Sequence, residues 1–203
     1  MKLGKNRIHF LIMLFAVLSL LVHVPSDAYA NDGGTITEVD SLEHDAANGR
    51  YNSLVQVDSD TYALAYYGIS GDGFISTFDI DSTGDITPIR VANHATLGEG
   101  SSVNLEHDTV YARYNSLVQV DSDTYALAYT GSNGKISTFT ISSDGTITAV
   151  KTQSLGNNLE HDTDGVIENS LVQVDSDTYA LAYAELVYDG AGRDGHISTF
   201  TIS

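Results

Sequence analysis

The stretch NSLVQVDSDTYALAY decides how this chain folds, because it occurs three times without a change, at Asn52–Tyr66, Asn115–Tyr129 and Asn169–Tyr183. Each copy is preceded by the string LEHD and followed by the string ISTF, while the segments between these strings vary in length. Self-similarity of this kind outweighs any local propensity. Residues 42–203 are therefore a tandem repeat of one structural unit.

Within one unit every local signal indicates β-structure. In Tyr62–Tyr66, read as YALAY, bulky and small residues alternate with the period of two that is typical of a strand. Turn sequences rich in Gly, Asp and Ser separate this run from the strands around it, and no window has a helical period. Each unit is expected to be a four-stranded antiparallel meander. Pro88 falls in the fourth strand, which should therefore be the outermost.

The alternation also predicts how the units associate. Tyr62, Leu64 and Tyr66 point to one face of their strand, and Ala63 and Ala65 point to the other. A sheet with one bulky and one small face can stack on its own copy, bulky side against small side. We therefore expect the sheets of successive units to pack face to face.

Repeat length, strand count and duplication together resemble a β-propeller, in which four-stranded blades pack radially around a channel. The resemblance covers residues 34–203 and points to no named blade family, because the chain has neither a WD40 Trp-Asp pair nor a kelch double glycine. It implies an all-β array of three four-stranded blades, at about residues 42–91, 105–150 and 159–203, with LEHD in the crossing from rim to centre. A β-trefoil or a β-prism is the alternative for three such units.

The two ends of the repeat region resemble a ring closed by strand exchange. Gly34–Val39 matches Gly145–Val150, which is read as a fourth strand, whereas the third unit reaches Ser203 directly after its third strand. The resemblance implies that the N-terminal strand 34–39 completes the last blade. Propellers usually have four to eight blades. We therefore expect a homodimer or higher homo-oligomer that completes the ring, or a longer array of which these units are a part.

The first thirty residues predict a secretion signal peptide. Lys2, Lys5 and Arg7 precede the apolar run Phe10–Val22, and Ala28–Ala30 offers small residues to a signal peptidase. The apolar run is shorter than the roughly 20 residues that span a bilayer. The expected organisation is a signal peptide at 1–30 and a β-repeat domain at 31–203. No membrane span remains after cleavage, so the protein is expected to be secreted or at the cell surface.

Composition excludes several classes of function. The chain of 203 residues has 9 Lys and Arg against 27 Asp and Glu, a formal charge of -18, and no Cys. Disulfides, cysteine-based metal sites and thiol nucleophiles are therefore absent. Nucleic acid is not an expected partner, because the chain has no basic footprint.

The histidines of the three LEHD strings, His44, His107 and His161, are the first candidates for chemistry. A histidine between two carboxylates could bind a metal or transfer protons. Neighbouring side chains of an extended segment point to opposite sides, however, so one triplet does not make a compact site. We expect these histidines to be structural, each hydrogen-bonded to a turn carboxylate such as Asp58 or Asp60.

The repeated Asp-Ser-Asp turns are weak candidates for calcium, which prefers carboxylate oxygens. The spacing lacks the other acids and the glycine of an EF-hand loop, and Asp and Ser also suit a tight turn. The expectation is no cofactor, with calcium as the alternative. The six acids are Asp58, Asp60, Asp121, Asp123, Asp175 and Asp177.

An enzyme is not the expected reading. The chain has no G-x-S-x-G, no H-E-x-x-H and no phosphate-binding glycine loop, and identical units offer the same surface several times. Repeated surfaces favour multivalent binding. A polysaccharide hydrolase or lyase is an alternative, because it needs only two well-placed acids. Glu168, Glu185 and Asp189 are acids that the other units lack.

The ligand contacts are expected in the loops, which differ between units and sit on a rigid scaffold. Tyrosine rings stack on sugars, and arginines bind carboxylates or hydroxyls. The predicted function is a secreted, lectin-like, non-enzymatic binding module for a glycan or another extracellular polymer, with a self-assembling structural protein of the cell envelope as an alternative. The candidate ligand-binding residues are Arg50, Tyr51, Tyr111, Arg113, Tyr114, Tyr188 and Arg193.

Overall fold

A computed structural model describes residues 37–89, 101–102, 104–152, 155–186 and 192–203. The expected signal peptide at 1–30 and the candidate Tyr188 lie outside the described residues. The described chain is all-β, with one short 3-10 turn, η1 (Ile69–Gly71), as its only helical element. None of its helical segments is long and apolar enough to cross a membrane.

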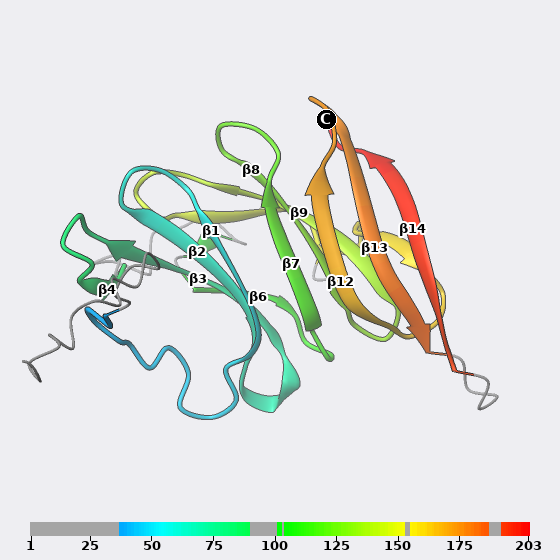
Figure 1. Ribbon diagram of the computed structural model, residues 1–203, viewed down its shortest axis with the longest axis horizontal. Helices are drawn as coiled ribbons and strands as arrows, with labels where there is room; N and C mark the ends of the chain where they lie inside the picture. Colours follow the sequence, from blue (N-terminus) through cyan, green and yellow to red (C-terminus); the bar gives the residue numbers. More distant parts are fainter. Residues whose placement is uncertain (1–36, 90–100, 103, 153–154, 187–191) are drawn as a thin grey trace, which may run out of the picture. The chain divides into compact units, whose positions relative to one another are not determined.

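The first sheet contains the first unit and is antiparallel, with the strand order β1-β2-β3-β4 (Figure 1). Val55 lies opposite Ala63, and Ala65 lies opposite Ile75, so the alternation of the sequence becomes an alternation of faces. A further strand, β6, pairs with the other half of β3. The bounds are β1 (Arg50–Gln56), β2 (Thr61–Tyr67), β3 (Gly73–Ile80), β4 (Ile86–Pro88) and β6 (Asn104–Asp108).

The second sheet repeats this arrangement in the order β5-β10-β9-β8-β7, and β11 pairs with the half of β9 that β10 leaves open. The third sheet has the order β12-β13-β14. The bounds are β5 (Ser101–Ser102), β7 (Arg113–Gln119), β8 (Thr124–Thr130), β9 (Gly134–Ile141), β10 (Ile147–Lys151), β11 (Leu159–Asp162), β12 (Val166–Gln173), β13 (Thr178–Leu186) and β14 (Arg193–Thr201).

The second and third LEHD strings are strands rather than a plain crossing. They form β6 and β11, and each pairs with the third strand of the sheet before it: Leu105 lies opposite Ile75, and Leu159 lies opposite Ile136. The outer edge of a sheet is therefore shared by two short strands, one before and one after the variable loop. Each LEHD strand belongs by its hydrogen bonds to the preceding sheet.

The expected closing strand, residues 34–39, lies only partly within the described residues. Of residues 34–39, only 37–39 are described, and Thr37–Val39 form no strand. Val39 lies beside Gly84 in the first sheet, and Asp40 accepts a hydrogen bond of 2.9 Å from the Ile86 amide. Among the described residues β14 pairs with β13 alone. Val39 and Asp40 therefore contact the turn before β4 and β4 itself, and the third sheet has three strands among the described residues.

The stacking expected from the alternation is confirmed. We call the side of each sheet that carries the tyrosines and leucines of YALAY its tyrosine face, and the opposite side its alanine face. Ala63 and Ala65, on the alanine face of the first sheet, share one buried cluster with Tyr125, Leu127 and Tyr129, on the tyrosine face of the second. A second cluster joins the alanine face of the second sheet to the tyrosine face of the third; it includes Ala126, Ala128, Tyr179, Leu181 and Tyr183.

Close packing explains why this pairing is specific. A tyrosine ring needs the room that a methyl group leaves, so two tyrosine faces would clash and two alanine faces would leave voids. The rings of Tyr125, Tyr129 and Tyr179 are completely buried at the two junctions. We call these the first junction, between the first and second sheets, and the second junction, between the second and third.

Polar contacts repeat at the two junctions and tie the first strands of neighbouring sheets together. The Leu117 amide donates to Ser53 Oγ, and the Leu171 amide donates to Ser116 Oγ, both at 2.9 Å. The side-chain amides of Asn115 and Asn169 donate to the carbonyls of Tyr51 and Tyr114, both at 3.1 Å. These sequence-repeated bonds fix the register of one sheet on the next. None of the sheets described here closes into a barrel.

Candidate functional site

The candidate site begins at an irregularity that recurs where the first strand of each sheet starts. The pairing of β1, β7 and β12 with the next strand shifts register there. The backbone of Tyr51, Tyr114 and Glu168 has φ of 55°, 53° and 60°, a left-handed conformation that is uncommon for residues other than glycine. The Asn side chain of the next sheet holds the first two in place. The bulge therefore presents a side chain at the same end of each sheet.

At the first junction this end is filled by rings and a guanidinium group. Tyr51 and Tyr114 stack at a tilt, with ring centroids 4.6 Å apart. The Arg113 guanidinium carbon lies 5.4 Å from the Tyr67 ring centroid and 5.0 Å from that of Tyr111. Its hydrogen bond to Tyr67 raises the pKa of Arg113 above its usual value. The arginine is thus held charged and in place by tyrosines.

At the second junction the same end is hollow. A cavity of about 350 Å³ opens there, because Thr130 stands at the repeat position of Tyr67 and Ile167 at that of Arg113. The smaller side chains leave the space that the tyrosine and arginine fill at the first junction. The cavity is lined by Tyr111, Arg113, Tyr114, Thr130, Gly131, Ser132, Gly165, Val166, Ile167 and Arg193.

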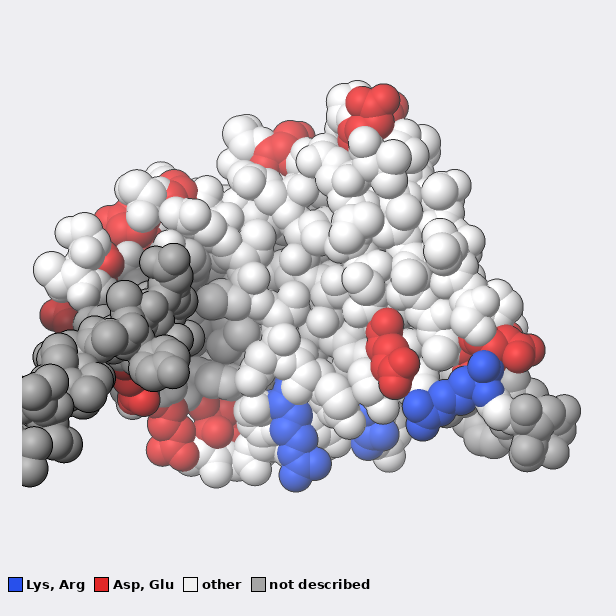
Figure 2. Space-filling model, in the orientation of Figure 1, with Lys and Arg blue, Asp and Glu red and all other residues white. Residues whose placement is uncertain are grey.

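The cavity lies at the only edge where cations appear in Figure 2. The Lys and Arg side chains of that view line the lower edge, where β7 and β12 begin in Figure 1. Arg193 lies 3.4 Å from Glu168, and both side chains are more than half exposed, so solvent screens this pair. Burial raises the pKa of Tyr114, and neighbouring Tyr51 raises it further, so the phenol stays a neutral hydrogen-bonding group.

The structure brings together four of the seven residues that the sequence singled out for ligand binding. Tyr111, Arg113, Tyr114 and Arg193 line the cavity. Tyr51 touches Tyr114 from the first junction, and Arg50 is an exposed residue at the start of β1 that does not line it. The cavity thus collects residues from both units that meet there.

Sequence reasoning missed the residues that make the space. Thr130 donates a hydrogen bond of 2.6 Å to the Val166 carbonyl across the junction, and Asn169 donates to Thr130 at 3.3 Å. The signal was available in the sequence: the residue after each YALAY is Tyr67, Thr130 or Ala184, the first position at which the repeats differ. Where a large side chain of one repeat is replaced by a small one, next to packing that the repeats share, a cavity can open.

The six calcium candidates lie in hairpin turns. The Asp58 carboxylate accepts hydrogen bonds from the Asp60 and Thr61 amides, at 3.2 and 3.0 Å, and Asp121 does the same for Asp123 and Thr124. In the third turn Asp175 accepts from the Ser176 amide at 2.8 Å. Backbone amide donors lower the pKa of Asp58 and Asp121 below its usual value. These carboxylates bind their own turns.

A different group of acids comes close enough together to share a cation. One carboxylate oxygen from each of Asp162, Asp164 and Glu185 lies within 4.8 Å of the other two. Glu185 also lies 3.2 Å from His196. Among the described residues this is the one such group, and none of the six predicted calcium ligands belongs to it.

The three LEHD histidines pack through their rings. His44, His107 and His161 meet the last tyrosine of YALAY in their own unit edge-on, at centroid distances of 4.7, 4.8 and 4.9 Å. The expected hydrogen bond to Asp58 or Asp60 is not made among the described residues. Both ring nitrogens of His107 and His161 are buried there without a hydrogen-bond partner.

His107 is completely buried, next to the ion pair formed by Lys135 and Asp108 at 3.3 Å. Burial lowers its pKa to about 4, against the opposing effect of Asp108, and Lys135 lowers it further. The imidazole is therefore neutral near pH 7, which suits a packing role.

A scan against models of protein families finds no match to this chain, and a search of curated proteins finds none either.

Proposed function

We propose that the protein is a secreted, non-enzymatic binding module that recognises a glycan or another extracellular polymer. The observation that carries the proposal is the cavity at the second junction, where Tyr111, Arg113, Tyr114 and Arg193 meet. Its volume of about 350 Å³ falls within the range of small-molecule sites.

The chemistry of the lining suits sugar units. Tyr111 is half exposed and lines the cavity beside Arg113, while Ser132 offers a hydroxyl group. Arg113 and Arg193 place two cations in a chain whose formal charge is -18. Arginine forks bind carboxylate and sulfate groups in a two-pronged geometry. We therefore expect acidic sugars, such as uronic acids or sulfated sugars, to bind better than neutral ones.

We also propose that the three sheets are blades of a β-propeller. The first strands of neighbouring sheets are bonded to one another through Ser53 and Ser116, which suits strands that line a common axis. In the first and second sheets the fourth position holds short strands, and in the first sheet this strand contains Pro88. Both features suit the outer rim of a propeller. If several chains complete one ring, each chain would contribute its own cavity at the second junction, and the assembly would carry several binding sites.

A glycan array, screened with and without Ca²⁺, tests the binding proposal. We expect selective retention of acidic glycans, and then measure the dissociation constant of the best one by calorimetry. Arg113→Ala should weaken binding about tenfold or more, since a charged hydrogen bond contributes roughly 1.5–3 kcal/mol. Arg50→Ala is the matched control, because it removes the arginine at the same repeat position outside the cavity. An array without any selective glycan, or equal losses in the two variants, contradicts the proposal.

The same experiment separates the other readings. A hydrolase or lyase that uses Glu168 or Glu185 would release shorter products from the bound polymer. A structural protein would bind no glycan and would assemble with itself. The exposed apolar residues of the first and third sheets favour self-assembly as a second property of this chain.

A further inference from the structure

Residues with identical sequence surroundings differ sharply in exposure between the sheets. Leu117 and Leu171, on the tyrosine faces of the second and third sheets, are 5% and 3% exposed, whereas Leu54 at the same position of the first sheet is 55% exposed. On the alanine faces, Ile75 and Ile136 are 0% and 4% exposed, but Ile197 is 78% exposed. The difference cannot come from local sequence, and it marks two faces that no other sheet covers among the described residues.

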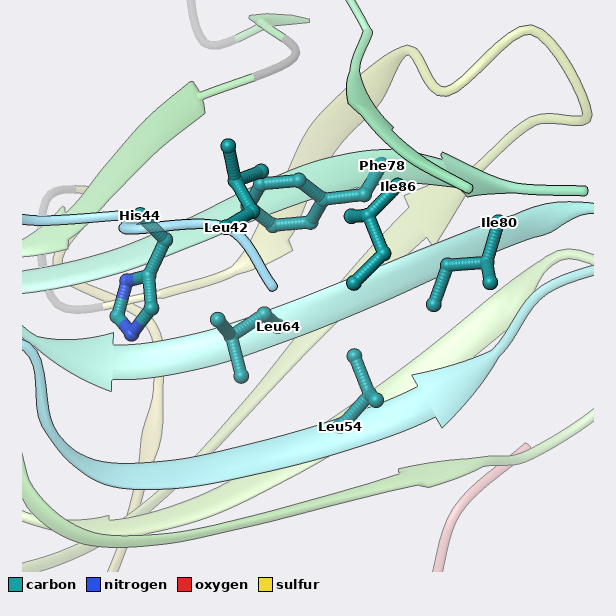
Figure 3. Close-up of a pocket in the computed structure, with 7 residues that line it drawn as sticks. All are labelled: Leu42, His44, Leu54, Leu64, Phe78, Ile80 and Ile86. Atoms are coloured by element: carbon teal, nitrogen blue, oxygen red, sulfur yellow. The ribbon is translucent and has the colours of Figure 1, made fainter. Parts of the chain in front are cut away.

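The first sheet has a partly open tyrosine face: Leu54 is exposed, whereas Leu64, Tyr66 and Phe78 form a buried cluster against which Leu42, Phe74 and Ile86 pack. Figure 3 shows its apolar side chains around a shallow cavity of about 150 Å³. At the two internal junctions, the alanine face of the preceding sheet covers the same positions. The cavity is lined by Leu42, His44, Leu54, Leu64, Phe78, Ile80 and Ile86.

The open alanine face belongs to the third sheet. Val172, Val174 and Ile197 are 51%, 63% and 78% exposed there, and Ala182 is exposed. The matching residues of the first two sheets lie in or against the buried clusters. Contiguous exposed apolar residues of this kind mark an interaction surface.

We propose that a second copy of this chain fills both vacancies, by placing the alanine face of its third sheet on the tyrosine face of the first sheet. This contact would repeat the first and second junctions, which already join the same two kinds of face within the chain. The proposal concerns self-association and stands independently of the proposed ligand.

A glycine next to each histidine supports this occupant. A Cβ atom built on Gly73 would lie 2.6 Å from the His107 ring, and one built on Gly134 would lie 2.6 Å from the His161 ring. The third member of this glycine set, Gly195, has nothing within 4 Å of that point. The remaining LEHD histidine is His44, which packs on Tyr66 as the other two pack on their own tyrosines, and whose ring lies beside Gly49 within the single chain. We infer that Gly195 receives His44 of the second copy.

The open strand edge fits the same copy. β6 and β11, which carry the second and third LEHD strings, pair with β3 and β9, while the first string, Leu42–Asp45, forms no strand. The matching edge of β14 has no partner among the described residues. Extending the register of the two internal junctions places Leu42 opposite Ile197, and Asp45 opposite Gly195, of the second copy.

The repeated polar contacts extend in the same way. At the internal junctions a Ser Oγ accepts a hydrogen bond from the backbone amide of the leucine in the next sheet. Ser170 holds this position in the third sheet, and the Leu54 amide holds the donor position in the first. The two faces are therefore complementary in shape, strand edge and hydrogen bonding. The contact joins unlike surfaces, so it closes a ring of copies or builds a filament.

Sedimentation velocity on the purified protein over a concentration series tests the proposal. We expect a mass above that of one chain, which grows with concentration, and at least a 100-fold weaker association for Ile197→Asp. Leu155→Asp is the control, since Leu155 is a half-exposed loop residue outside both faces. Circular dichroism verifies that both variants are folded. A monomer at all concentrations, or equal association of the two variants, overturns the proposal.

A cysteine experiment tests the register directly, because the chain has no Cys of its own. Opposed residues of antiparallel strands have Cα atoms about 4.5–5.5 Å apart, within the range that a disulfide bridges. Leu42→Cys and Ile197→Cys chains, mixed and oxidised, should give a covalent dimer that neither gives alone. Leu42→Cys mixed with Leu155→Cys is the control. A yield no higher than this control contradicts the proposed pairing.

Discussion

The middle sheet and the two outer sheets carry the same core strings, yet among the described residues only the middle sheet has another sheet packed on each face. Leu117 is buried under the first sheet, while Leu54, at the same position of the first sheet, is more than half exposed. The repeat therefore specifies a strand and its two faces, but the neighbouring sheet determines how much each residue contributes to stability. Positions with identical letters should differ in energy by the burial that stacking gives them.

The largest difference is expected for one leucine. Leu117→Ala should destabilise the chain by roughly 2–5 kcal/mol, because it empties a packed position at the first junction. Leu54→Ala should cost less than about 1 kcal/mol, since that side chain is largely exposed. Urea unfolding at concentrations where the chain is monomeric measures both. Equal costs would mean that the sheets do not stack as described.

Acid should weaken the fold through His107. Its folded pKa of about 4 lies below the unfolded value of 6.5, so the unfolded state binds more protons between these limits. Stability should therefore fall as the pH falls from 6.5 to 4, by on the order of 3 kcal/mol. Lys135 and Asp108, the charged groups that act on the ring, are paired with each other.

His107→Phe keeps a ring at the junction and removes this titration. Unfolding free energies measured from pH 7 to 4 should have a smaller slope in the variant, and the slope that remains includes that of His161, whose pKa burial also lowers. Carboxylates whose pKa is lowered, such as Asp58, lose their contribution only below their unfolded value of 3.8, so both proteins should weaken together at lower pH. An unchanged slope between pH 6.5 and 4 would contradict burial of His107.

The smallest difference is expected at the arginines. Arg113 lies against the rings of Tyr67 and Tyr111, and its replacement by Ala should cost about 0.5–1 kcal/mol. Arg50→Ala, at the same position of the exposed first strand, should leave thermal unfolding unchanged. The comparison also shows whether weaker ligand binding by Arg113→Ala results from a lost contact in the cavity or from a destabilised fold. A larger loss for Arg50 than for Arg113 would argue against the ring contacts.

Much of the fold could be predicted because the same strand and turn pattern recurs in all three repeats. The alternation in YALAY predicts the strand and its two unlike faces, and these faces stack as expected. The pairing of β6 and β11 with the preceding sheet could not be predicted, because it depends on which edge remains open beyond a variable loop. The closing strand at residues 34–39 rests on a sequence match and stays a prediction, and among the described residues Val39 contacts Gly84, in the turn before β4.

The candidate site could be predicted only in part. Four of the tyrosines and arginines singled out from the sequence line the cavity, and their role in ligand binding stays a prediction. The cavity itself arises from what is missing: Thr130 is smaller than Tyr67, and Ile167 replaces the arginine of the other units. Its size depends on how two sheets pack, which no single repeat specifies. The ring contacts of the histidines were missed for the same reason, since their partners lie on neighbouring strands.

Substituting leucine for one alanine at a time, at Ala128 and at Ala182, is the most direct test of the stacking of tyrosine faces on alanine faces. The two residues hold the same position, but Ala128 is completely buried under the third sheet and Ala182 is exposed. Unfolding of the dilute monomer should show a loss of roughly 1–3 kcal/mol for Ala128→Leu, from overpacking, and almost none for Ala182→Leu. Equal effects at the two sites would contradict the stacked arrangement.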